Sequence, residues 1–290
     1  MRQEVVMRKS FAVNIVLVAI KVLSGFVFNS VALIADGVHS ISDLLSDVFV
    51  ILGMRHSGKP ADDDHPFGHG KFEYVLSFIL GLSIITIAYN LGKNVIVNFA
   101  EPVKIPSIVS LAIVTLVVLV KLVLARYLIK QGEILDSEII SASGKESFTD
   151  VISSVVVFVG ILCVILGERF DSQILLKGDK IASIMIALFI VKIGIEIIFN
   201  AIKSLQGKAV RSEISVQYEE MIETVPGVIK CDHLVMITYG PYYQALAEIR
   251  VDGKITVKEG HDIAEAVTLK LLNDEKICHA IIHVNPEVKK

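Results

Sequence analysis

Long apolar stretches separated by short polar connections dominate the first two hundred residues of the chain. Each stretch has about 20 residues or more, which as an α-helix is long enough to cross the roughly 30 Å hydrocarbon layer of a bilayer. The pattern predicts six transmembrane helices, over residues 10–29, 31–54, 73–99, 107–130, 139–167 and 178–203. We expect the spans to end there, because no further apolar stretch of this length follows in the sequence.

Beyond residue 207 the pattern changes to that of a small soluble module. Segments with the period of an amphipathic helix occur there together with segments of alternating apolar and polar residues, the pattern of a half-buried strand. The predicted elements are a helix over 212–224, strands over 230–238 and 244–251, a helix over 257–273 and a strand over 279–284. Ser212 is the predicted N-cap of the first helix. This order predicts a small α+β domain with both helices on one face of a sheet.

The composition is that of a membrane protein. Hydrophobic residues make up 53% of the 290 residues, which is more than ordinary soluble proteins contain. The net charge of −3 gives no reason to expect nucleic acid as a partner. Cys163, Cys231 and Cys278 have no spacing that predicts a disulfide framework or a four-thiolate zinc site.

Basic residues gather on one side of the predicted spans. They are Arg2, Arg8, Lys9, Arg55, Lys59, Lys71, Arg126 and Lys130. Because cytoplasmic loops carry the excess of lysine and arginine, we expect both termini in the cytoplasm. The first apolar run has no small-residue cleavage pattern before it ends, so it is expected to be a retained span. The expected location is the plasma membrane.

A polar stripe runs along the second predicted span. Asp36, His39, Asp43 and Asp47 follow one another at spacings of three, four and four residues, so on an α-helix they share one face. On insertion scales, these aspartates facing lipid would together cost about 7 to 10 kcal/mol, which is close to the whole stability of a domain. The stripe is therefore expected to face protein, water or a bound cation.

The fifth predicted span opens with a second polar pair. Glu146 and Asp150 are four residues apart and share one helix face. If the two spans meet at similar depth, His39, Asp43, Glu146 and Asp150 form a cage of one imidazole and three carboxylates. This donor set suits zinc or a neighbouring first-row divalent cation.

A different interpretation is that basic residues neutralise these acids. Those within or near the spans are Lys21, Lys93, Lys121 and Lys192. Such pairing explains one acid more readily than four acids and a histidine on two helices with matching spacing, so we favour the ion site. Asp36 and Asp47 are either steps on the path of the ion or partners of lysine.

The loop between the second and third spans carries a further group of donors. Asp62, His65 and His69 lie in a stretch whose prolines and glycines predict a loop. Their nitrogen and oxygen atoms are enough to bind a second divalent ion near the cytosolic membrane face. An ordinary solvated acidic loop is an equally simple interpretation of these residues taken alone.

Half of the eight histidines fall in the C-terminal module. They are His233, His261, His279 and His283, and Asp232 and Glu248 lie in the same module. The grouping favours a cytosolic metal site, and the alternative is that these histidines simply lie on the surface.

Together these motifs resemble the cation diffusion facilitator family. The resemblance rests on His39-Ser-Ile-Ser-Asp43 in the second span, the loop stretch from Asp62 to Lys71 and the acid pair of the fifth span, and it covers essentially the whole chain. It implies a membrane all-α six-helix transmembrane domain followed by a small α+β ferredoxin-like cytosolic domain. The expected domain ranges are 1–207 and 208–290. It also implies a homodimer that exports divalent metal from the cytosol in exchange for protons.

By matching position, the resemblance assigns three groups of metal ligands. They are a transport site of His39, Asp43, Glu146 and Asp150, a loop site of Asp62, His65 and His69, and a cytosolic-domain site of Asp232, Glu248, His261 and His283. Zinc-transporting members have histidine where Glu146 stands, so this site is harder and admits manganese, iron or cobalt. The implied cargo is Zn²⁺, Mn²⁺, Fe²⁺, Co²⁺ or Cd²⁺, and no cofactor is expected.

The expected mechanism is metal–proton antiport by alternating access around a site near the bilayer midplane. Metal binding needs a neutral imidazole and ionised carboxylates, so protons compete with the metal. Two alternatives are a membrane-embedded metallohydrolase that uses the histidine loop and a membrane-anchored metal-binding sensor. The sequence has no His-Glu-x-x-His helix and no nucleophile elbow, which argues against the enzyme. A sensor leaves the polar stripes of the spans unexplained.

Overall fold

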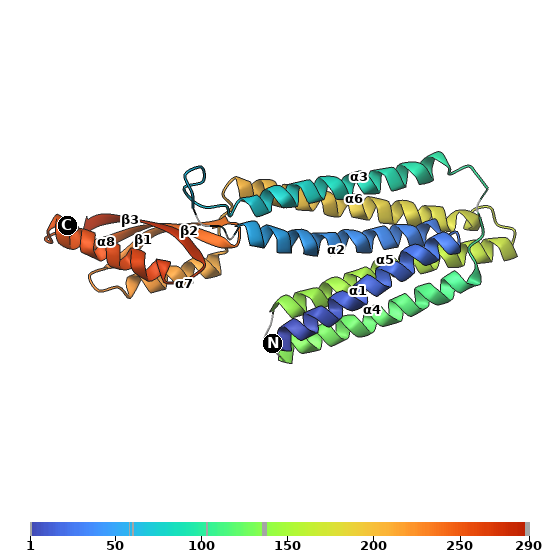
Figure 1. Ribbon diagram of the computed structural model, residues 1–290, viewed down its shortest axis with the longest axis horizontal. Helices are drawn as coiled ribbons and strands as arrows, with labels where there is room; N and C mark the ends of the chain where they lie inside the picture. The colour runs from blue at the N-terminus through green and yellow to red at the C-terminus, as the bar shows by residue number, and fades with distance from the viewer. Residues whose placement is uncertain (1, 58, 60, 103, 135–137, 288–290) are drawn as a thin grey trace. The chain divides into compact units, whose positions relative to one another are not determined.

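The computed structural model describes residues 2–57, 59, 61–102, 104–134 and 138–287. Long helices fill the first part of the chain: α1 (Arg2–Val27), α2 (Val31–Ser57), α3 (Phe72–Val97), α4 (Ile108–Ile134), α5 (Glu138–Arg169) and α6 (Gly178–Leu205), with the short 3-10 turn η1 (Leu175–Lys177) before α6. Figure 1 shows the course of the ribbon. The chain packs as two compact units, one made of Met1–Val48 and Leu80–Glu196, the other of Phe49–Ile79 and Ile197–Lys290.

Within the described residues, five helices are long and apolar enough to cross a bilayer, namely α1, α3, α4, α5 and α6. Large apolar side chains lie on their outer surfaces: Leu23 and Phe26 of α1, Val123 of α4 and Leu188 of α6 are each 64–67% exposed. Apolar surface on long helices of this kind suits contact with lipid. The chain is therefore a multi-pass membrane protein with a helical transmembrane region. The count of six spans stays a prediction, because α2 is outside this set.

In the first unit, α4 and α5 pack against each other and α1 contacts both (Figure 1). The helices approach closely where glycines stand. A Cβ atom at Gly37 of α2 would lie 2.6 Å from Cγ2 of Val22 in α1, and one at Gly144 of α5 would lie 2.7 Å from Cγ1 of Ile129 in α4. Small residues at such crossings let helix backbones pack tightly in a membrane.

A carboxylate from another helix fixes the N-terminus of α2. Asp179, at the start of α6, accepts hydrogen bonds from Ser30 Oγ at 2.6 Å and from the backbone N–H groups of Val31 and Ala32 at 2.7 and 3.3 Å. The first N–H groups of a helix have no partner inside it, and a negative charge there also offsets the positive end of the helix dipole. This cap ties α2, which carries the polar stripe, to α6.

The second unit contains the C-terminal domain, a small α/β layer. Strands β1 (Lys230–Tyr239), β2 (Tyr242–Asp252) and β3 (Ile277–Glu287) form a sheet in the order β1-β2-β3, with β1 antiparallel and β3 parallel to β2. Helices α7 (Ser212–Glu223) and α8 (Val257–Leu272) pack on the buried alternate residues of β2. The predicted order of helix, strand, strand, helix, strand is confirmed.

The predicted N-cap of α7 is wrong. Arg211 occupies the cap position without a side-chain hydrogen bond to the helix, and Ser212 is the first helical residue. A capping box begins α8 instead, where the Thr256 hydroxyl accepts from Glu259 N and the Glu259 carboxylate accepts from the Thr256 backbone N–H. Thr-x-x-Glu is the more specific start signal, because both ends of the box satisfy a free N–H group.

Candidate metal centres

A buried group of donors lies between α2 and α5 in the first unit. His39 and Asp43 stand one turn apart on α2, and Asp150 faces them from α5. The Nδ1 atom of His39 lies 3.9 Å from Oδ1 of Asp43, and its Nε2 atom lies 3.8 Å from Oδ1 of Asp150. One ligand atom from each residue falls within 4.8 Å of the others, and His39 is only 3% exposed. The ring of Phe189 meets the imidazole edge-on at 5.5 Å between centroids.

The spacing of these atoms fits a metal ion better than hydrogen bonds. Among the described residues, the two ring nitrogens of His39 and Oδ2 of Asp43 have no hydrogen-bond partner, although all three atoms are buried. Polar atoms buried in this way are rare unless something else satisfies them. Two ligand atoms that each lie about 2.1 Å from a tetrahedral metal are about 3.4 Å apart, close to the observed separations. The separations in this donor group are therefore compatible with a small divalent cation after a slight contraction.

The fourth predicted member of this site, Glu146, is not in the close group that the other three residues form. Glu146 is on the exposed side of α5, whereas the ligand atoms of the other three lie within 4.8 Å of one another. The structure thus brings together His39, Asp43 and Asp150. A role for Glu146 as the fourth ligand stays a prediction.

Two lysines reach acids of the predicted polar stripes. Lys121 Nζ of α4 lies 2.6 Å from Oδ2 of Asp150, and Lys21 Nζ of α1 lies 2.8 Å from Oδ2 of Asp36. Lysine pairing therefore accounts for two acids, where the sequence suggested one. Lys93 and Lys192 are exposed. The side chain of Asp47 lies outside the described residues.

Asp36 accepts hydrogen bonds from serine side chains in addition to its ion pair with Lys21. The hydroxyl groups of Ser153 and Ser154 on α5 donate to its two carboxylate oxygens at 2.7 and 2.8 Å. Lys21 also donates to the Ser40 hydroxyl at 3.0 Å, and both charged side chains are fully buried. The lysine interpretation of Asp36 is the one that the contacts favour, and this network joins α1, α2 and α5.

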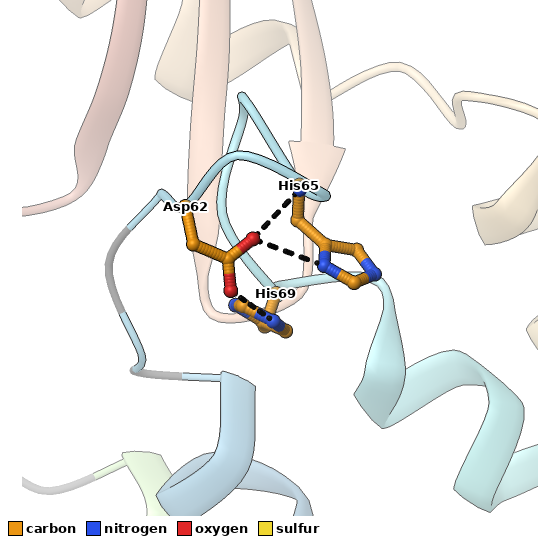
Figure 2. A group of neighbouring side chains, drawn as sticks. All are labelled: Asp62, His65 and His69. Carbon is orange, nitrogen blue, oxygen red and sulfur yellow. Dashed lines mark hydrogen bonds and ion pairs between the residues drawn. The ribbon is translucent and has the colours of Figure 1, made fainter.

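The loop donors gather in the second unit. Figure 2 shows Asp62 between the two histidines: its Oδ1 lies 3.2 Å from Nδ1 of His65, and its Oδ2 lies 3.3 Å from Nε2 of His69. The His65 backbone N–H also donates to Asp62 Oδ1 at 2.7 Å. Desolvation raises the pKa of the Asp62 carboxyl, but the hydrogen bonds from His65 and the nearby His69 together lower it below the ordinary value. The loop therefore presents one ionised carboxylate and two imidazoles within reach of one ion.

The loop is tied to the hairpin between β1 and β2. The Tyr239 hydroxyl donates to the Gly68 carbonyl at 2.9 Å, and the Gly240 N–H donates to the Tyr74 hydroxyl at 2.7 Å. The Lys71 ammonium lies 5.7 Å from the centre of the Tyr239 ring, a cation–π contact. The hairpin thus supports the backbone that carries the loop histidines.

Among the described residues, the four predicted donors of the C-terminal domain do not form one group, although Glu248 and His283 are cross-strand neighbours. Asp232 receives two hydrogen bonds from the Arg250 guanidinium, at 2.6 and 3.1 Å. Glu248 accepts a long hydrogen bond from Asn285 at 3.4 Å, and His261 and His283 are exposed. Metal binding by this set stays a prediction.

His233 belongs to the histidine group of the C-terminal module but not to the ligand set that the resemblance implies, and it pairs across the sheet with Glu248. On its other side Glu248 pairs with His283. The register of β1 shifts between Cys231 and His233, and this irregularity puts His233 in that row.

Comparison with known proteins covers both parts of the chain. Residues 7–206 match the family of the cation efflux transmembrane domain, and residues 210–287 match the family of the cation efflux protein cytoplasmic domain. The manganese efflux system protein MneP of Bacillus subtilis is 32% identical over 94% of this chain and 92% of its own. An uncharacterized transporter of Methanocaldococcus jannaschii is 33% identical over 94% of both chains. Magnetosome protein MamB of Paramagnetospirillum magneticum is 30% identical over 96% of this chain and 91% of its own.

Proposed function

Since the chain belongs to the cation efflux family, known also as the cation diffusion facilitators, we propose that it moves Mn²⁺ out of the cytosol through the group of His39, Asp43 and Asp150. That it is a divalent metal efflux transporter, and not an enzyme, follows from the family itself. The cargo, the site and the coupling to protons are the proposed parts.

One observation carries the site: an imidazole and two carboxylates converge in the interior of an apolar helical unit, at separations that suit a divalent ion. Charged groups inside a membrane are costly and mark ion pathways. The manganese preference is supported by the names of two relatives, the manganese efflux proteins MneP and MneS of Bacillus subtilis, the second 26% identical over 97% of this chain. Carboxylate-rich sites with a single imidazole also suit Mn²⁺ better than thiolate sites do.

The proposed cycle is alternating access with proton exchange. His39 must be neutral and the carboxylates ionised to bind the ion, so protons that arrive from the outer side release it. Glu146, one turn from Asp150, is proposed to complete the ligand set when the helices close on the ion. Zn²⁺, Fe²⁺, Co²⁺ and Cd²⁺ are the competing cargoes.

The remaining architecture is proposed from the same family. It comprises six spans with both termini in the cytoplasm, a transmembrane domain over 1–207, a ferredoxin-like cytosolic domain over 208–290 and a homodimer. The loop donors and the donors of the C-terminal domain are proposed as secondary, regulatory ion sites. The cytoplasmic-domain match supports the dimer and the two-part organisation.

Transport in vesicles tests the proposal. Asp43→Asn and Asp150→Asn keep the size of each side chain and remove its charge, and we expect either to abolish proton-driven Mn²⁺ flux in proteoliposomes. Asp63→Asn, at an exposed loop carboxylate, is the matched control and keeps full flux. Undiminished flux in both site variants rules the site out. Absence of flux in the parent, with metal binding intact, would instead favour a sensor. Competition by zinc, iron, cobalt and cadmium ranks the cargoes.

A further inference from the structure

We propose that the Lys121 ammonium is a tethered competitor of the transported ion. In the ion-free carrier it holds Asp150, and the incoming divalent cation must displace it to use that carboxylate. The inference rests on the proposed function, because it assigns a role at the same site to a residue that is not a metal ligand.

The contact is close and shielded from water. Lys121 lies in the middle of α4 and is 3% exposed, and its Nζ atom donates to Oδ2 of Asp150 at 2.6 Å. The other oxygen of the same carboxylate points to His39 Nε2 at 3.8 Å. One carboxylate therefore serves both the lysine and the donor group.

The two cations cannot both use Asp150 without cost. A metal ion bound to Oδ1 would lie about 2.1 Å from that oxygen. The ammonium on Oδ2 would then be only a few ångströms away, in a buried pocket where like charges repel with little screening. Lysine has a long flexible side chain with a compact charge, so it can swing away when a stronger cation arrives.

The other buried lysine differs in the partners of its acid. Asp36 already accepts from Ser153 and Ser154 besides Lys21, and it is not in the group of ligand atoms within 4.8 Å. Asp150 receives only Lys121 among the side-chain donors described, and it faces an imidazole with no hydrogen bond. Lys21 therefore pairs with an acid that has several other hydrogen-bond donors, whereas Lys121 pairs with a carboxylate that belongs to the proposed ion site.

Such a competitor has a use in a carrier. Once the divalent ion has left, two carboxylates would remain close together in the membrane interior, which is unfavourable. The returning ammonium neutralises one of them and lets the empty carrier change conformation. The same competition excludes weakly bound monovalent ions, because they gain too little from the carboxylate to displace it.

Mn²⁺ binding to the full-length protein in lipid nanodiscs tests the proposal. The protein has several candidate ion sites, so the Mn²⁺ binding that is lost in Asp43→Asn is taken as binding to the site in the transmembrane helices. In Lys121→Gln that component should bind with a Kd lower by about 5- to 150-fold, the usual range for coupling between two ligands. Lys121→Arg retains a cation and should resemble the parent. Lys192→Gln removes an exposed lysine that lies 3.7 Å from Glu196, and it is the control.

Thermal melting gives a second readout. Without its lysine, Asp150 is a buried charge that only the metal compensates, so added Mn²⁺ should raise the Tm of Lys121→Gln by more than that of the parent. A lysine with a purely structural role would lower the Tm equally with and without Mn²⁺.

The outcomes separate the two proposals. If Asp43→Asn removes no Mn²⁺ binding, the site itself fails, and the competitor fails with it. If that component exists but is unchanged or weaker in Lys121→Gln, only the competitor fails. If Lys121→Gln is too unstable to purify without metal, expression and purification in Mn²⁺ must rescue it, and failure of this rescue also overturns the competitor.

Discussion

The ion pair between Lys21 and Asp36 gives a quantitative test of the helical packing. Removing either charge, by Lys21→Met or Asp36→Asn, leaves the other one buried without its partner. Both side chains have 0% exposed surface and the charged atoms are 2.8 Å apart, so no discount for solvent screening applies. Each single substitution should cost about 3 to 5 kcal/mol of unfolding free energy.

The double variant should cost much less than the sum of the two. With both charges gone, the amide oxygen introduced by Asp36→Asn can still accept from Ser153, and the methionine introduced by Lys21→Met fills the volume of the lysine stem. Replacing a whole buried pair by neutral groups is often close to neutral, so we expect a loss of about 2 kcal/mol or less. The coupling energy between the two sites is then about 4 to 10 kcal/mol, far above the usual additivity error of roughly 0.5 kcal/mol.

The free energy of unfolding of the parent, the two single variants and the double variant is measured by denaturant unfolding of the purified protein in detergent, followed by circular dichroism. The control is the exposed pair of Lys192 and Glu196, 3.7 Å apart and 70% and 61% exposed, whose cycle should give below about 1 kcal/mol. If the buried pair gives a coupling as small as the exposed pair, the reasoning that α1 and α2 meet through this contact is wrong.

Three further predictions concern the second unit. Thr256→Ala should speed hydrogen exchange at the start of α8, by an amount equal to about 1 kcal/mol, whereas Ser212→Ala should leave α7 unchanged because Ser212 makes no cap. Gly240→Ala should raise the protease sensitivity of the loop before α3, since Gly240 has φ +63° and its new Cβ would collide with the carbonyl of Gly70. The hydrogen bond from the Tyr218 hydroxyl lowers the pKa of Asp274. The ionised carboxylate should therefore contribute its full stabilisation of the folded state above about pH 4, the ordinary Asp pKa, and lose it as the pH falls further. Melting curves from pH 6 to 3 measure this loss.

Helical periodicity made part of the transport site predictable. His39 and Asp43 are four residues apart, and any α-helix puts such residues on one face, so their proximity needs no tertiary information. The loop group was predictable for a similar reason, because Asp62, His65 and His69 are close in sequence and prolines and glycines fold the chain back on itself.

Contacts between elements that are distant in the chain could not be predicted from the sequence pattern. The partner of Lys121 depends on which face of α4 turns toward α5. That orientation goes with tertiary contacts such as the close approach of Ile129 to Gly144, which the sequence pattern does not specify.

Asp232 shows the same limit in the sheet. The family resemblance assigned it a ligand role by matching position, but its carboxylate binds Arg250. The register shift between Cys231 and His233, which places His233 opposite Glu248, is not specified by strict strand alternation.

The contribution of Glu146 to metal choice can be tested by Glu146→His. If Glu146 joins His39, Asp43 and Asp150 once an ion is bound, an imidazole in its place makes the set softer, and softer sets favour Zn²⁺ over Mn²⁺. We expect the ratio of zinc to manganese transport, measured by competition in proteoliposomes, to rise about tenfold or more, the scale on which changes around a metal site usually act.

Thr149→His is the matched control for this experiment, because it adds an imidazole to an exposed position of the same helix. It should leave the ratio unchanged. If Glu146→His transports Mn²⁺ with the ratio of the parent, Glu146 binds the ion in no state of the cycle. The site then consists of His39, Asp43 and Asp150 with water or another residue as the fourth ligand.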